Sequence, residues 1–528
     1  MDTQYYSTVH RRTYEQGYSV STRIVNACYY CCLPFHRSQT NRQRLLIWSS
    51  CFYRPHDGHY CLFYSFEKID TGNNSEVIMT ENKGFDAALK YPLFDSIFNR
   101  RTRRIAKGLD EIGAGSLSYK PTSKPEPLGE LEEALLIAMT GVTGYTFPDR
   151  PFQDHSGEDI MGTPNVYMPG RSAGSPDNVQ ATHFFLINDE GTYYLKKNLD
   201  VENIDFSPSN LIERARASKQ KISDERLEYP RKFPYYLDSN RFMSNKPGTT
   251  IIVPVLDTTP QYINGMMYLL TQPEGHKPAF LDDKYFYRLA GVKKHVKSGY
   301  LNKDIMVPLG LLGTFRADME VGMLMQNLFL TTQAMGLGGW IHASFGPPFL
   351  LGNHPQYADN PEVDGLGLGF RYELPKRRLK NPATWLGAIR KARANPVGLT
   401  GIIEGLCPPY HSNMDAAVDA LLELKYGEKG AYKDTDYFET IFKADGGKRY
   451  LEEVPHYNKQ VEIVCKDVCN WIYDTHGRFP AHVDAMFVPG IWLQAHHLDL
   501  DYYDHLFKTG KGVGYSQTQK QHEDLWHV

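Results

Sequence analysis

The chain has 528 residues, of which 41% are hydrophobic and 23% are charged. These fractions are typical of a globular protein, and the length suggests about two to four domains. The 58 Lys and Arg residues nearly balance the 61 Asp and Glu residues, which excludes the strong positive charge of a nucleic-acid binder. No apolar run reaches the roughly 18 residues that cross a bilayer, and no secretory signal is visible. We therefore expect a cytoplasmic protein with neither a nucleic-acid nor a membrane partner.

The first stretch, Met1–Ile78, differs in composition from the rest of the chain. Five of the eight cysteines lie in it, at Cys28, Cys31, Cys32, Cys51 and Cys61. The stretch admits three interpretations. Cys28, Cys31, Cys51 and Cys61 with His59 allow an irregularly spaced zinc site. A disulfide framework would need an oxidising compartment, which nothing else in the sequence supports. Alternatively, because the sequence from Met79 reads as a normal start, residues 1–78 form a poorly structured or non-native extension.

The next segments predict three helices and a hairpin. A short helix within residues 84–104 leads into a basic cluster. Pro127–Met139 predicts a helix, because acidic residues fill its first turn and apolar residues follow at helical spacing. Thr182–Lys196 predicts a β-hairpin, since two aromatic and β-branched runs flank an acidic turn with glycine. Residues 202–233 are polar and predict a helix followed by a loop.

The middle of the chain is more apolar. Thr249–Leu256 predicts a buried strand, and Gln261–Thr271 predicts a neighbouring strand. Asp318–Met335 is apolar nearly all round, which predicts a central buried helix, and Gly336 is expected to end it. Gly365–Tyr372 predicts a short strand.

The pattern becomes mostly helical, with long loops, from about residue 381 onward. We therefore expect an α+β fold with two parts after Ile78: a core of residues 79–384 and a mostly helical C-terminal extension of residues 385–528.

Two cationic clusters suit a ligand that carries a phosphate. The first is Asn99–Arg104, which reads Asn-Arg-Arg-Thr-Arg-Arg, and the second is Leu374–Leu379, which reads Leu-Pro-Lys-Arg-Arg-Leu. Arginine offers bidentate donors and permanent charge, and threonine adds a neutral donor. Each cluster alone also fits a solvated basic surface.

Two further segments indicate a ligand site only when they are considered together with these clusters. Gly170–Asn178 is a loop of small polar residues whose amides and hydroxyls suit the edge of a flat heterocycle, although it also fits an ordinary turn. Gly322–Trp340 reads as a helix with a glycine stop, and a plain core helix explains it equally well.

The order and spacing of these four segments resemble the nitroreductase family of flavin enzymes. The first motif is similar to that family's Arg-Arg-Ser-x-Arg motif, and Gln326–Gly338 is similar to its helix ending in Ala-x-Gly-Leu-Gly. The loop and hairpin of residues 171–195 resemble the azoline-dehydrogenase subgroup. The resemblance covers residues 95–380 and implies a nitroreductase-like three-layer core, with a central antiparallel or mixed sheet flanked by helices.

The resemblance also implies an FMN cofactor at the interface of a homodimer, and it assigns the flavin-binding residues. Arg100, Arg101 and Thr102 would approach the phosphate and ribityl chain, and Arg104 would place a positive charge near the flavin pyrimidine. Lys376 and Arg378 match the family's closing phosphate-binding pair. Ser172, Ser175 and Asn178 are candidates for the edge of the ring.

The implied chemistry needs no catalytic side chain. The flavin takes a hydride from NAD(P)H and reduces a small-molecule substrate, while the protein orients the ring and sets its electrostatics. No Gly-x-Gly-x-x-Gly lies between a predicted strand and helix, so we expect no separate nicotinamide-binding domain.

Two alternatives stay open. Ile105 and Ala106 stand where the family commonly has an aromatic residue, and the polar loop is altered, so a non-catalytic member that binds flavin or another ligand is the first alternative. The second is a metal-dependent hydrolase that uses a C-terminal cluster of imidazoles and carboxylates. Its members are His476, His482, Asp484, His496, His497, Asp499, Asp501 and His505. We expect most of these to be helix caps or core residues, and we predict no metal ligand.

Overall fold

The computed structural model describes the chain between Asn82 and His527, with gaps at residues 146–148, 150, 154–158, 161–168, 177, 198–204, 274, 283–288, 344–345, 378–384, 455 and 509–513. The stretch Met1–Ile78 and its cysteines lie outside the described residues. The zinc, disulfide and extension interpretations therefore stay predictions. Within the described part, no helix combines the length and the apolar character needed to cross a membrane.

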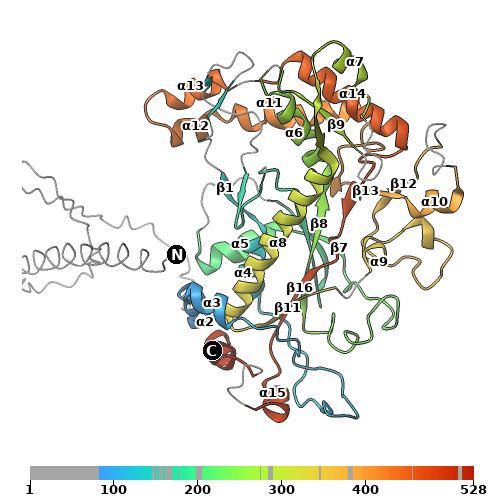
Figure 1. Cartoon of the computed structure of the whole chain (residues 1–528). Coiled ribbons are helices and arrows are strands. Elements are labelled where there is room, and N and C mark those ends of the chain that lie inside the picture. The colour runs from blue at the N-terminus through green and yellow to red at the C-terminus, as the bar shows by residue number, and fades with distance from the viewer. Residues whose placement is uncertain are drawn as a thin grey trace, which may run out of the picture. The chain divides into compact units, whose positions relative to one another are not determined.

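A seven-stranded antiparallel sheet occupies the centre of this part of the chain (Figure 1). The strand order is β11-β16-β8-β5-β6-β7, and β15 also pairs with β8. The strands are β5 (Thr182–Asn188), β6 (Gly191–Leu195), β7 (Lys219–Ser223), β8 (Thr250–Asp257), β11 (Gly338–His342), β15 (Met486–Phe487) and β16 (Trp492–His496). Together with the helices, this sheet gives the α+β class that the sequence predicts.

The centre of the sheet follows the predicted pattern. β5 and β6 form the expected hairpin, joined by Asp189 and Glu190. β8 is buried along its whole length, as its run of β-branched residues predicts. The hairpin and this strand pair in register, with Leu186 opposite Ile252.

Helices cover one face of the sheet. α4 (Glu130–Thr140), α5 (Pro208–Ser218) and α8 (Leu309–Met335) lie there. The core beneath them includes Leu136, Phe184, Leu186, Ile252, Leu324 and Leu328. The other face packs mainly on loops and the short helix α9 (Pro347–Leu351), through Tyr235, Tyr236, Leu350 and Phe370. The expected layer of helices is therefore clear on one face only.

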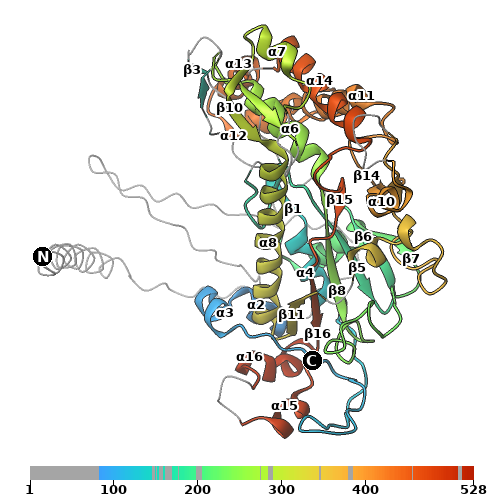
Figure 2. The same ribbon diagram turned by 45° about the vertical axis from the view of Figure 1, so that its right-hand side comes forward.

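A second group of helices packs beyond the N-terminal end of α8, around two further cores, of which the smaller lies between α12 and α13 (Figure 2). It contains α6 (Thr258–Leu270), α7 (Lys293–Lys297), α11 (Met414–Tyr426), α12 (Thr435–Ile441), α13 (Gly446–Glu453) and α14 (Lys459–His476). The strand predicted at Gln261–Thr271 is wrong, because this segment is part of α6. Asp257 caps that helix by accepting from the Thr259 amide at 2.9 Å, and the apolar run that follows fits a buried helix as well as a strand.

The predicted boundary near residue 385 does not separate a helical extension from the core. β16 is an inner strand of the central sheet, paired with the edge strand β11 on one side and with β8 on the other. The chain then continues into α15 (Leu500–Leu506), α16 (Gln517–Lys520) and α17 (His522–Trp526), and α17 packs against α2 (Lys83–Leu89). The C-terminal region is thus an integral part of the core.

The remaining elements are short. α3 (Leu93–Asn99) precedes the first basic motif, and α10 (Gly387–Ala392) follows the second. The small strands are β1 (Val142–Tyr145), β2 (Phe152–Gln153), β3 (Asp159–Ile160), β4 (Pro169–Arg171), β9 (Pro278–Leu281), β10 (Asn302–Pro308), β12 (Arg371–Glu373), β13 (Asn395–Leu399) and β14 (Ile403–Glu404). The strand predicted at Gly365–Tyr372 is mostly loop, because Gly365, Gly367 and Gly369 all have positive φ.

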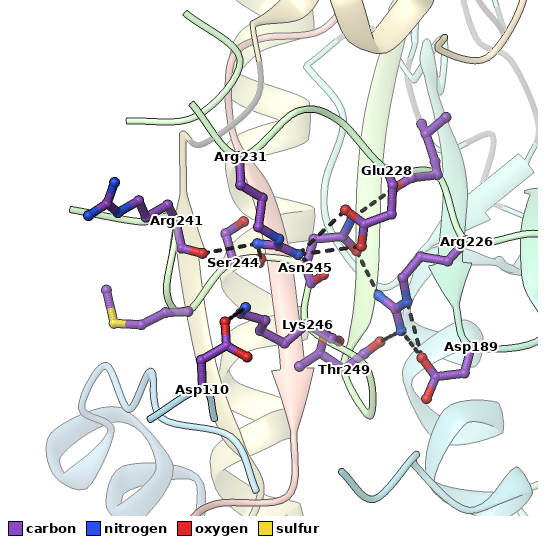
Figure 3. Close-up of polar contacts among 12 residues, drawn as sticks. Asp110, Asp189, Arg226, Glu228, Arg231, Arg241, Ser244, Asn245, Lys246 and Thr249 are labelled. Carbon is purple, nitrogen blue, oxygen red and sulfur yellow. Dashed lines mark hydrogen bonds and ion pairs between the residues drawn. The ribbon is translucent and has the colours of Figure 1, made fainter. Parts of the chain in front are cut away.

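A polar network holds the long loop that precedes β8 (Figure 3). Arg226 donates to Asp189 in the hairpin turn at 2.7 Å and to the Asn245 side chain at 2.6 Å. Arg231 donates to the carbonyl oxygens of Arg241, Ser244 and Asn245 at 3.0, 2.8 and 2.8 Å. Lys246 forms an ion pair with Asp110, which follows the first basic motif. These donors are used to fix the loop, so the network has a structural role.

α8 differs from the helix predicted at Asp318–Met335. It starts earlier, at Leu309, and one face of it is exposed. The apolar residues of that face recur every fourth position, at Leu311, Phe315, Met319 and Met323, and each has 38–59% of its surface exposed. The helix ends as expected at Gly336, which has a left-handed conformation with φ of 79°.

Candidate functional site

The first basic motif lies against the C-terminal half of α8. Arg100 follows α3, and its guanidinium lies 4.4 Å from the centre of the Phe329 ring. Its Nε atom is buried and has no hydrogen-bond partner among the described residues. A buried cationic donor of this kind is costly unless something accepts from it, so Arg100 is suited to an anionic ligand.

The rest of the motif runs along the edge of β11. The Arg103 amide donates to the Gly339 carbonyl at 3.2 Å, and the buried Arg103 side chain binds the Gly514 carbonyl. Arg101 and Arg104 are exposed, and the Arg104 guanidinium lies 5.5 Å from the Trp340 ring centre. Thr102 is half-buried. Arg103 therefore anchors the motif, while its neighbours present their charge outward.

The predicted polar loop is tied to α8 by a buried carboxylate. Glu320 accepts from the Ser175 hydroxyl at 2.7 Å, and from the amide and hydroxyl of Thr182 at 2.9 and 2.6 Å. Asn327, two turns further along α8, donates to the Ser172 carbonyl at 2.6 Å. The sequence pattern did not single out Glu320 or Asn327, because their partners lie about 140–155 positions away.

An open groove of about 530 Å³ lies between this loop and the exposed face of α8. Its lining residues are Ser172, Ala173, Gly174, Met319, Gly322, Met323, Gln326 and Asn327. Gly322 is in the helix interior, where glycine costs about 1 kcal/mol relative to alanine. Among the described residues, no atom lies within 4 Å of the Cβ it lacks. Its missing side chain thus leaves room for a ligand to approach the helix backbone.

Ser175 and Asn178, two of the residues predicted to meet the edge of the flavin ring, already take part in hydrogen bonds within the protein. The Ser175 hydroxyl donates to Glu320, and the Asn178 side chain accepts from Gln180 at 3.0 Å. Ser172 donates its hydroxyl to the Met139 carbonyl at 2.7 Å, but it still lines the groove. Of the three predicted loop residues, only Ser172 therefore borders the groove, where its hydroxyl oxygen can accept.

The second cationic cluster lies elsewhere. Lys376 packs over the Tyr473 ring of α14 at 5.1 Å, and Tyr473 shares a core with Leu309 at the start of α8. Arg100 contacts Phe329, twenty residues along that helix, or about 30 Å at 1.5 Å per residue. α3 and α14 accordingly lie at opposite ends of α8 (Figure 2). Within one chain, Lys376 does not join Arg100 around one phosphate, and Arg378 lies outside the described residues.

Burial shifts several ionisable groups behind the polar loop. Burial and the nearby Arg171 lower the pKa of Lys197 to about 7, and burial raises the pKa of Asp257 to about 6. Burial, helped by Lys197 and Arg171, also lowers the pKa of His183. Lys197 and His183 contact each other at 3.5 Å, and Lys197 also donates to the Gln180 carbonyl. These shifts predict that the support of the loop depends on pH.

The proposed C-terminal hydrolase cluster is not one site. His476 and His482 lie near the buried Asp282, at 3.9 and 3.7 Å. Asp499 caps α15 by accepting from the Tyr502 amide. His497 instead lies beside Glu132 of α4. The eight residues are thus distributed over separate places, because β16 and the turns beside it carry them to different parts of the core.

Comparisons with known proteins add little information about the site. No family model matches the chain, and no curated protein matches it. Among solved structures, it is similar to a protein from Ralstonia eutropha JMP134 that is described as a nitroreductase. The identity is 13% and the TM-score 0.21, and the match covers 48% of this chain and 71% of the other. These values do not define a family for this chain.

Proposed function

We propose that the chain is an FMN-dependent oxidoreductase of nitroreductase type. It would transfer a hydride from NAD(P)H through the flavin to a small-molecule acceptor. The observation that supports this most is the position of the first basic motif. The motif lies beside the C-terminal half of α8. The neighbouring turns of that helix, which include Gly322, line the groove together with Ser172 of the polar loop.

The residues of this site fit a flavin phosphate. Arg100 has a buried Nε without a partner in the described part of the chain, and Arg101 is exposed beside it. A doubly charged phosphate would accept from both groups and relieve the unpaired donor. Thr102 adds a half-buried hydroxyl next to them.

The groove fits the flat part of the cofactor. Gly322 leaves the α8 backbone accessible, while Met319 and Met323 offer flexible apolar contacts. FMN supplies the hydride chemistry when it is bound. The chain's part is to orient the ring through Ser172 and the groove walls, and to present the positive charge of Arg104.

The exposed stripe of α8, which comprises Leu311, Phe315, Met319 and Met323, supports the expected homodimer. An unpaired apolar stripe along a central helix is typical of a surface that another protein covers. Two of its residues also line the groove, so a second copy packed there would close the flavin site.

A binding experiment tests the phosphate assignment. Arg100→Ala should weaken FMN binding about 10- to 100-fold, because one charge-assisted contact contributes about 1.5–3 kcal/mol. Lys376→Ala is the matched control, since it removes a positive charge at the other end of α8, and its affinity should stay at the wild-type value. Fluorescence quenching of FMN measures both.

The outcomes separate the proposals. Unchanged FMN affinity in Arg100→Ala would reject the phosphate assignment. Bound FMN that is not reduced by NADH or NADPH would favour the first alternative, a non-catalytic flavin-binding protein.

A further inference from the structure

A buried group of three imidazoles and one carboxylate lies apart from the groove. It comprises Glu132 at the start of α4, His497 directly after β16, and His522 and His527 at the C-terminal helix α17. One ligand atom from each residue lies within 4.8 Å of the others. Glu132, His497 and His522 are each at most 4% exposed, whereas His527 borders solvent.

The three imidazoles point the same nitrogen at the same oxygen. The Nε2 atoms of His497, His522 and His527 lie 3.2, 2.7 and 3.7 Å from Glu132 Oε1. The second carboxylate oxygen, Oε2, accepts from the Gly129 amide as part of the α4 cap. His522 Nε2 is buried and makes no hydrogen bond of good geometry with any described residue, although the carboxylate is adjacent.

The opposite ring nitrogens face acceptors outside the group. His497 Nδ1 lies 3.1 Å from the Glu126 carbonyl, and His522 Nδ1 lies 2.8 Å from the Met335 carbonyl. A carbonyl only accepts, so both Nδ1 atoms carry a proton. His527 Nδ1 lies 3.5 Å from the Glu126 carboxylate. Metal-binding histidines are typically oriented by such an acceptor, which leaves the Nε2 lone pair free for the ion.

The charge around the group also suits a cation. If the imidazoles are neutral, Glu132, Glu126 and Glu523 carry three negative charges, and Lys107, which pairs with two of them, carries one positive charge. Two negative charges are left over, which a divalent ion would cancel. Without an ion, this surplus of negative charge is left in a largely buried place, which is costly.

We propose that Glu132, His497, His522 and His527 bind a divalent transition-metal ion, with zinc as the best chemical fit. Imidazole and carboxylate are zinc ligands, and ligands around a tetrahedral zinc lie about 3.3 Å apart, close to the separations present here. Four protein ligands complete a tetrahedral shell, so the site is structural. It fastens α17 and the segment after β16 to α4.

Metal analysis of the purified full-length chain is the direct test. Protein prepared without chelator should contain about one zinc per chain, and EDTA should lower its Tm by about 5 °C, the size expected for the loss of a tight ligand. Replacing the zinc with Co²⁺ should produce the visible absorption of a tetrahedral cobalt site, read as a difference spectrum.

Two variants and one control complete the test. Glu132→Gln and His522→Asn should lose the metal and the sensitivity to EDTA. The control His276→Asn changes an exposed histidine outside the group and should keep both. Wild-type protein that contains no metal, takes up neither Zn²⁺ nor Co²⁺, and has the same Tm with and without EDTA would overturn the proposal. The four residues would then be an ion-pair cluster only.

Discussion

Lys197 shows how strongly its surroundings act on a single side chain. Its ammonium group lies close to Gln180 and His183, and burial together with Arg171 lowers its pKa from 10.5 to about 7. This shift favours the uncharged amine far more than in an exposed lysine, in a region that supports the wall of the proposed flavin groove.

This shift predicts a pH dependence of stability. Because the pKa is lower in the folded state, the unfolded chain binds more protons between about pH 7 and 10.5. The free energy of unfolding should therefore rise with pH across that window. Lys197→Met should flatten this rise in urea unfolding, and the exposed neighbour Lys196→Met serves as the control. An equal pH slope in Lys197→Met and wild type would show that the Lys197 shift is absent.

Sequence reasoning named some residues of the candidate site and missed others, for a physical reason. Arg100 and Arg104 belong to a local run of like charges, which is visible without a structure. Glu320 looks like an ordinary polar position in an apolar helix, and its importance depends on Thr182 and Ser175, which only folding brings close. Lys376 shows the converse limit of such patterns. Two charge clusters look alike in sequence, but within one chain Lys376 lies at the other end of α8 from Arg100.

At the scale of elements, α8 offers two glycines for which opposite effects on stability are expected: Gly322 in its interior and Gly336 directly after its end. Gly322→Ala should stabilise the protein by up to about 1 kcal/mol, because the helix interior prefers alanine and an added Cβ meets no described atom. The same change should weaken FMN binding several-fold if the ring lies over Gly322. Urea unfolding and FMN titration measure the two effects.

Gly336→Ala should have the opposite effect on stability. Its φ of 79° disfavours a side chain, and the new Cβ would lie 2.5 Å from the Thr518 carbonyl. We expect a loss of more than about 1 kcal/mol in the same urea experiment. Unchanged stability in this variant would show that the end of α8 is formed differently.

The elements themselves were predictable where the local pattern was unambiguous. The hairpin at Thr182–Asn188 and Gly191–Leu195 has its own turn, and α4 has an acidic first turn. Gln261–Thr271 was wrong, because its apolar run suits either state and the Asp257 cap decides for a helix. β16 was missed, since its partners β8 and β11 lie more than 150 residues earlier in the chain.

At the scale of the whole molecule, the account requires a second copy against α8. The double change Phe315→Glu and Met319→Glu places charges on the exposed stripe and should convert a dimer to a monomer in sedimentation velocity. Leu424→Glu alters an exposed apolar residue on α11 and should leave the dimer intact. If the double variant sediments as a dimer, as the Leu424→Glu control does, this face of α8 is excluded as the dimer interface.

The measurement that tests the central claim most directly is the visible absorption spectrum of the purified chain, followed by the mass of any chromophore released on denaturation. The account predicts a yellow protein that releases FMN, or a colourless one that becomes yellow when FMN is added. A colourless protein that fails to bind added FMN would contradict the assignment of the groove beside α8 as a flavin site.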